Sequence, residues 1–276
     1  MSGPIPPSEI EPQNPRLRTL GSIFVIPRVM PDSPKNSRRA LVFLALTAVS
    51  LVGLLLLPSI HQDQNYHDFA DQRTIFGIPH FWNAVSNLLF IAVGVVGVAQ
   101  FRRDAAIALL FLAIFMTGFG STYYHLDPTD RTLFWDRLPM AIAFMTILAM
   151  AVGERLDAKT GAILLWPLIA IGVFSILLWR WTGDLRLYGW VQFFPCLVLP
   201  VLFLRFPSKY SCTSYWLIAA ALYVLAKLFE FNDGAIYSIG SILSGHTLKH
   251  IAAAAACFAI LRHFQKRQPI GVVTKD

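Results

Sequence analysis

Long apolar runs with few charges recur along most of this 276-residue chain. Each run approaches the roughly 20 residues that a helix needs to cross the hydrocarbon core of a bilayer. Inside a bilayer every backbone N–H and C=O must be bonded within the segment, so the runs predict transmembrane helices. The eight expected spans cover residues 40–58, 82–100, 105–124, 137–153, 162–180, 187–204, 214–230 and 246–262.

The composition excludes an ordinary soluble domain. Only 14% of the residues are charged, whereas soluble domains carry roughly a quarter. The formal net charge of +7 is concentrated at the ends of the apolar runs and in the tails, a pattern typical of helices oriented in a bilayer. We therefore predict an all-α polytopic membrane bundle with no nucleic-acid partner. The positions of the cysteines favour buried thiols over disulfides; they are Cys196, Cys212 and Cys257.

Four regions are expected along the chain. Residues 1–39 are rich in proline and arginine and are predicted to form a disordered basic tail. Residues 40–58 form a first transmembrane helix, and residues 66–263 contain the seven further spans. Residues 264–276 form a second tail.

The basic residues also predict an orientation. When the loops alternate across the membrane, most Lys and Arg fall on one side, so the positive-inside rule places both tails in the cytoplasm. We expect the chain to lie in a plasma (inner) membrane. All histidines except His263 then lie at the exterior end: His61, His67, His80, His125, His246 and His250.

Five polar residues stand at or beside the ends of apolar runs: Ser121, His125, Asp136, His246 and His250. Ser121 and His125 are four residues apart, as are His246 and His250, so each pair shares one helix face. Three imidazoles in an apolar surround, with a hydroxyl and a carboxylate nearby, suit a catalytic zinc site with an open fourth position. Polar groups at membrane depth are costly, which favours a functional role.

Each residue also has a purely structural interpretation. A histidine at a helix end is often interfacial, and Asp136 at the start of a span suits a helix cap with Arg137 as its partner and Pro139 in the first turn. In the functional interpretation Asp136 orients or deprotonates a metal-bound water and Ser121 bonds the developing oxyanion. The spacing leaves both interpretations of Asp136 open. Lys249 is expected to point to a different helix face from the histidines.

These residues resemble the alkaline ceramidase family, part of a superfamily that includes the adiponectin receptors and progestin-receptor-like proteins. The shared pattern is Ser-x-x-x-His, an aspartate eleven residues later and a late His-x-x-x-His, and the stretch Phe81-Trp-Asn-Ala-Val-Ser-Asn87 resembles the start of the family's first core helix. The resemblance covers about residues 66–263. It implies a seven-helix core, here with one extra N-terminal helix, and cleavage of the ceramide amide to sphingosine and a fatty acid. It also implies zinc bound by His125, His246 and His250, with Ser121 and Asp136 as catalytic residues.

The segment before the first core helix departs from the family. Calcium-using alkaline ceramidases carry acidic residues there, whereas His80 stands where that pattern has a glutamate. Asp68 and Asp71 do not reproduce the family's Asp-Trp-x-Glu arrangement. The sequence therefore argues against a calcium site and extends the expected substrate from ceramide to related lipid amides.

Other functions are compatible with the same residues. A lipid-responsive receptor with a vestigial or slow hydrolase site is one, and a phospholipid esterase on the same scaffold is another, because zinc chemistry does not select the leaving group. A transporter ranks last: Lys227 and Glu230 suit an ion pair better than a relay, and there is no evident inverted repeat. The sequence does not identify the oligomeric state.

Overall fold

The computed structural model describes residues 34–270, apart from the side chains of residues 34–40, 42 and 43. Within that range the chain is helical and has no β-strand beyond two isolated bridges, as the sequence predicts. The helices are η1 (Gln64–His67, a 3-10 turn), α1 (Pro34–Leu56), α2 (Phe81–Val85), α3 (Leu88–Phe101), α4 (Ala105–Leu126), α5 (Asp130–Arg155), α6 (Ala158–Thr182), α7 (Arg186–Arg205), α8 (Ser214–Phe231), α9 (Asp233–Tyr237) and α10 (Gly245–Lys266).

Six helical segments of the described chain are long and apolar enough to cross a membrane: α2 together with α3, and each of α4 to α8. The chain is therefore a multi-pass membrane protein. α10 matches α4 in length but carries His246, Lys249 and His250 in its first two turns, which lowers its hydropathy. α1 begins at Pro34, earlier than the expected span at residue 40, and the rest of the predicted basic tail lies outside the described residues.

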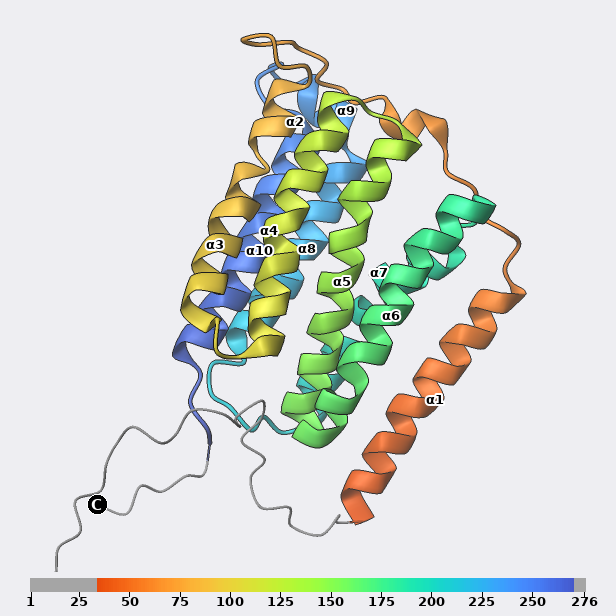
Figure 1. Ribbon diagram of the computed structural model, residues 1–276, viewed down its shortest axis with the longest axis vertical. Helices are drawn as coiled ribbons and strands as arrows, with labels where there is room; N and C mark the ends of the chain where they lie inside the picture. The colour runs from red at the N-terminus through yellow and green to blue at the C-terminus, as the bar shows by residue number, and fades with distance from the viewer. Residues whose placement is uncertain (1–33, 271–276) are drawn as a thin grey trace, which may run out of the picture.

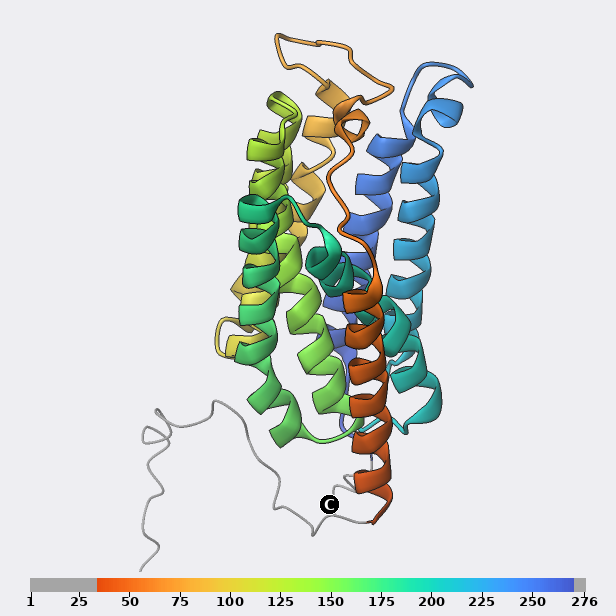
Figure 2. The same cartoon turned by 90° about the vertical axis from the view of Figure 1, so that its right-hand side faces the viewer.

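The long helices pack in one bundle with their axes roughly aligned (Figure 1). α4 packs against α3 and α5, α5 also packs against α6 and α7, and α10 packs against α8 and α3. α1 stands at the edge of the bundle, where it packs along α7 (Figures 1 and 2), and the Trp190 indole donates a 3.0 Å hydrogen bond to Ser50 Oγ.

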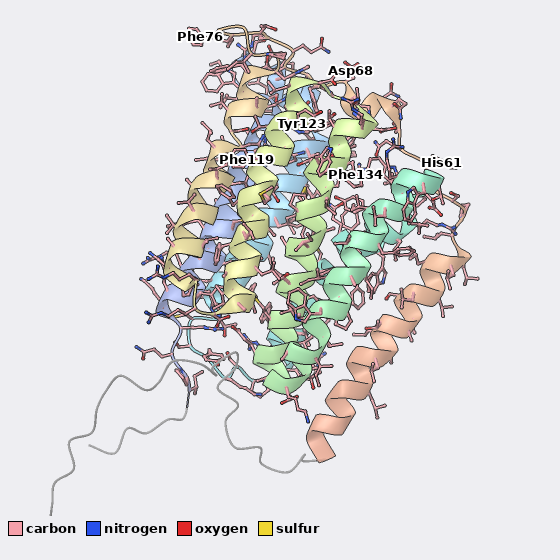
Figure 3. All side chains as sticks on the ribbon, viewed as in Figure 1. His61, Asp68, Phe76, Phe119, Tyr123 and Phe134 are labelled. Carbon is pink, nitrogen blue, oxygen red and sulfur yellow. The ribbon has the colours of Figure 1, made fainter. Side chains whose placement is uncertain are left out.

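The two ends of the bundle differ in the segments that cover them. The upper end in Figure 1 holds the segment between α1 and α2, the end of α4, the start of α5 and the start of α10. Figure 3 places His61 at the end of α6, Asp68 over the start of α5 and Phe76 at the tip of the loop before α2. The lower end holds the start of α1 and the end of α10 (Figure 1). The first and last described helices therefore have their outer ends on the same side of the bundle.

Two glycines allow helices to approach closely at the upper end. A Cβ on Gly120 would lie 2.1 Å from the Trp135 backbone oxygen, so any side chain there would push α4 away from α5. A Cβ on Gly245 would lie 2.2 Å from the Phe229 backbone oxygen, at the junction of α10 with α8. The first contact sets the spacing of α4 and α5, which carry Ser121, His125 and Asp136, and the second sets the start of α10, which carries His246 and His250, against α8.

The start of α5 corrects one sequence expectation. α5 begins at Asp130, and Thr129 caps it through a reciprocal capping box with Thr132. Asp136 therefore lies inside the helix, and the capping interpretation of Asp136 is wrong. Pro139 lies inside the helix as well, beyond its first turn.

Candidate metal centre and active site

Three histidines meet where α4 ends and α10 begins. One ligand nitrogen from each of His125, His246 and His250 lies within 4.8 Å of the others, and the ring centroids are 4.9 to 5.0 Å apart. None of the three is more than 4% exposed. The structure thus brings together the two distant parts of the sequence pattern.

Hydrogen bonds from the break between α2 and α3 orient His250. Its Nδ1 lies 3.1 Å from the Asn83 carbonyl oxygen and 2.8 Å from Ser86 Oγ. A carbonyl only accepts, so Nδ1 carries the proton and Nε2 keeps its lone pair. That Nε2 lies 3.4 Å from His125 Nε2.

The sequence interpretation missed Asn83 and Ser86 because it treated residues 82–100 as one uninterrupted span. The Asn83 side-chain oxygen also accepts a 2.6 Å hydrogen bond from Thr247 Oγ1, which ties the start of α2 to α10. The available signal was the set of polar residues three or four apart at the start of an apolar run, which share one helix face.

The nitrogens of the triad are suited to a metal ion. His125 Nδ1 and His246 Nε2 are buried without a hydrogen-bond partner among the described residues. Buried polar atoms are normally paired, and two imidazole lone pairs facing each other repel unless a proton or a cation lies between them. Three imidazole nitrogens are a common donor set for a catalytic zinc ion with one open position. The residues therefore fit the zinc ion that the resemblance implies.

Ser121 and Asp136 lie next to the triad on facing helices. Ser121 is 3% exposed, one turn before His125 on α4. Its side chain interacts with that of Asp136 across the close α4–α5 contact at Gly120. Ser121, Asp136 and His250 line the same cavity, so the hydroxyl, the carboxylate and one ring of the triad all reach it.

The cavity lies among α4, α5, α7, α8 and α10 and has a volume of about 440 Å³. Its upper end is polar. From His250 to Ile260 on α10 it extends roughly 15 Å, at 1.5 Å per helical residue. The lower part is lined mainly by apolar side chains, including Phe144, Ile147, Leu199, Phe203, Trp216 and Ile260.

The charged residues around the cavity depart from the sequence expectations. Arg137 forms no salt bridge with Asp136; its guanidinium lies against aromatic rings instead, 4.6 Å from the Trp179 centroid. Lys249 does not point away from the site. Its Nζ lies 2.9 Å from Glu230, which also binds Lys227 at 2.6 Å, as the predicted ion pair requires.

Phe69 covers the triad from the segment between α1 and α2. Its ring centroid lies 4.7 Å from that of His125 and 4.5 Å from that of His246, and Phe69 is 3% exposed. Asp233 holds this segment on α10, since its carboxylate accepts hydrogen bonds from the backbone N–H groups of Ala70 (3.0 Å) and His246 (2.7 Å). Neither Phe69 nor Asp233 was identified from the sequence, because their roles depend on contacts between segments far apart in the chain.

A second contact fastens the same segment. Arg73 forms a 2.7 Å salt bridge with Asp71 and donates a 2.7 Å hydrogen bond to the Ile242 carbonyl before α10. Burial raises the pKa of the Asp71 carboxyl, but the hydrogen bonds from Arg73 outweigh it, and the pKa lies below its ordinary value of 3.8. The Asp71 carboxylate, which precedes the first core helix, is thus engaged by Arg73.

The cysteines form no disulfide; all three lie within the described residues, and each is partly buried.

A comparison with models of known protein families gives a match. A family model described as Ceramidase matches residues 74–214, which is just over half of the chain. The match includes Ser121, His125 and Asp136 and ends before α10, which supplies His246 and His250. A comparison with curated protein sequences gives no match.

Proposed function

Because the chain belongs to the ceramidase family, we propose that it is a zinc-dependent membrane hydrolase that cleaves the amide bond of ceramide or a related lipid amide. The observation that carries the proposal is the buried cluster of His125, His246 and His250 beside the Ser121–Asp136 pair, at the polar end of an apolar cavity. A cavity with a polar end and a long apolar part suits a substrate that has a reactive polar head and a long hydrocarbon chain.

His125, His246 and His250 would hold the zinc ion, and the proton on His250 Nδ1 directs the other nitrogen of that ring to the metal. When bound, zinc polarises an acyl carbonyl and lowers the pKa of a bound water molecule to about 7. The Asn83 carbonyl and Ser86 hydroxyl keep the His250 ring in the required orientation.

Asp136 has the role of general base in this proposal. Its carboxylate accepts a proton from the attacking water and returns it to the leaving amine nitrogen, so that the amine departs as a neutral group. The Ser121 hydroxyl, which faces Asp136, rotates freely about its C–O bond and can donate to the carbonyl oxygen as negative charge develops there. Phe69 keeps bulk water away from the buried imidazoles.

The lipid chain would lie in the apolar part of the cavity, with the amide near His250 and Asp136. The basic residues of the loops support a cytoplasmic location for both termini and an exterior location for the active site, in a plasma (inner) membrane. Zinc fits the cavity's polar end, and the carboxylates near the first core helix do not supply the family's calcium pattern.

Asp136→Asn tests the proposal. Full-length protein is purified in detergent with zinc, metal content is measured, and hydrolysis of ceramide and a panel of lipid amides is followed by mass spectrometry. Loss of the general base should lower the rate by about 10²- to 10⁴-fold without loss of zinc. A wild-type protein that binds zinc yet releases no fatty acid from any lipid would instead favour the receptor interpretation, and an Asp136→Asn variant as active as the wild type would exclude the base.

A further inference from the structure

Arg137 is a buried cation beside the active-site carboxylate. It follows Asp136 on α5, lines the same cavity and is 7% exposed. Its guanidinium carbon lies 4.6, 5.0 and 5.4 Å from the ring centroids of Trp179, Tyr188 and Tyr66, respectively. Such cation–π contacts offset part of the cost of removing the guanidinium from water.

The hydrogen-bonding capacity of this guanidinium is not met. Arg137 Nη1 is buried and has no hydrogen-bond partner among the described residues, and none of the salt bridges within residues 34–270 includes Arg137. Aromatic faces do not accept N–H bonds as an oxyanion does. An unpaired charge at membrane depth is costly, and a planar fork of donors matches a carboxylate or a phosphate.

The neighbouring carboxylates are already engaged. Asp136 interacts with Ser121 and forms no salt bridge among the described residues. One Glu230 carboxylate serves Lys227 (2.6 Å), Lys249 (2.9 Å) and the Tyr66 hydroxyl (3.2 Å). The charged residues that line the cavity are three cations and two carboxylates, so its polar end has an excess of positive charge even before a metal ion is counted.

We propose that Arg137, which lines the same cavity as Lys249, forms an anion subsite that binds a carboxylate or phosphate of an amphiphile whose chain occupies the apolar part of the cavity. The identity of the anion rests on the proposed function. In the first case the head group of the lipid amide carries the anion; in the second the anion is the carboxylate of the released fatty acid. Binding itself does not depend on hydrolysis.

Binding of matched amphiphiles tests the subsite directly. Hexadecyl phosphate, hexadecanoate and hexadecanol have the same chain length, and their affinities for zinc-loaded, full-length protein are measured by calorimetry in one detergent. The two anions should bind about tenfold or more tightly than the alcohol, the range expected for a charged hydrogen bond. Arg137→Gln should remove this preference and leave the affinity for hexadecanol unchanged.

Two further variants separate the subsite from folding and from the metal. Arg131→Gln removes an exposed arginine of the same helix and should leave the preference intact. Arg137→Lys keeps the charge without the planar fork and should retain part of the preference, which provides a test if the Gln variant does not fold. A preference that survives Arg137→Gln, or one that disappears only in His250→Ala, would assign the anion to the metal and overturn the proposal.

Hydrolysis identifies the source of the anion. If the substrate head carries it, N-hexadecanoylglycine or ceramide 1-phosphate should be cleaved faster than ceramide, and Arg137→Gln should remove that difference. If the released fatty acid carries it, neutral ceramide should be cleaved as fast as the anionic amides, and inhibition by hexadecanoate should be lost in Arg137→Gln. Anion-selective binding without hydrolysis of any amide would retain the subsite while excluding the hydrolase, whereas equal affinities for all three amphiphiles would exclude the subsite.

Discussion

His263, at the lower end of the bundle, is as fully buried as His125 at the upper end, and neither side chain is exposed to solvent. The surroundings of the two rings differ. Both nitrogens of His263 face acceptors: Nδ1 lies 3.2 Å from the Cys212 carbonyl, and Nε2 lies 3.0 Å from Glu154 Oε1. His125 Nδ1 has no partner among the described residues.

The lower cluster is a closed network. Glu154 also accepts a 3.2 Å hydrogen bond from the Trp216 indole and a charged hydrogen bond from Arg267. Each of these groups therefore has a partner within the fold. Burial of ionisable residues therefore does not by itself indicate a site, whereas unpaired ring nitrogens next to a cavity indicate a place for a ligand.

Replacing a member of the triad should cause the greatest loss. His250→Ala should abolish zinc binding and lower hydrolysis by about 10³-fold or more, because a bound metal contributes several kcal/mol to the stabilisation of the transition state. Metal analysis and turnover of the purified protein measure both effects. Chelation of the wild type should reproduce the loss and added zinc should restore it; activity that persists without zinc would remove the basis for assigning the triad to a metal.

The corresponding change at the lower end should affect folding instead. Glu154→Gln leaves His263 and Arg267 without their charged partner, and breaking a buried ion pair costs about 3 to 5 kcal/mol. Thermal unfolding in detergent should show this loss of stability, while the folded variant keeps its zinc. If Glu154→Gln lost zinc while remaining folded, the two ends would be coupled and the contrast between them would fail.

A smaller effect is expected from the residues that orient the triad. Ser86→Ala removes the hydroxyl next to His250 Nδ1 and should weaken zinc binding by about 10- to 100-fold, as for other groups that orient a metal-binding histidine. Competition with a chromophoric chelator measures the affinity. Ser175→Ala is the matched control, since Ser175 is fully buried but bonds only within α6.

At low pH we expect a small effect, the loosening of the segment between α1 and α2 that covers the triad. The pKa of Asp71 is depressed in the folded protein, so its contribution to stability is present above the ordinary value of 3.8 and is lost as the pH falls through the folded-state value. Hydrogen exchange of the Ala70 and Arg73 amides should therefore accelerate below about pH 4, after correction for intrinsic rates. Asp71→Asn should show the faster exchange already at neutral pH; unchanged protection in this variant would mean that other contacts hold the segment.

Much of the fold and part of the site follow from the sequence alone. Long apolar runs and a spacing of four residues are local signals, so they predict the long helices and the shared faces of Ser121 with His125 and of His246 with His250. The pattern does not show which distant groups meet. Because Thr129 caps α5, the helix starts earlier than the apolar run predicts, and Asp136 lies inside it. The apolar run that begins at residue 82 also does not predict the break between α2 and α3 at Ser86. Phe69 and the aromatic surroundings of Arg137 depend on tertiary packing, which no local pattern reports.

α7 and α8 both line the cavity, and a seam runs between them. α7 packs against α1, α5 and α6, whereas α8 packs against α9 and α10, and Gln192 bonds the Tyr223 hydroxyl across the seam at 2.9 Å. Pro195 and Pro200 lie inside α7, where each leaves a backbone carbonyl without its helical partner. A lipid that enters the cavity between these helices arrives by diffusion in the plane of the bilayer. Its rate of capture then follows the mole fraction of that lipid in the membrane, and diluting it with inert lipid slows turnover even when the bulk amount is unchanged.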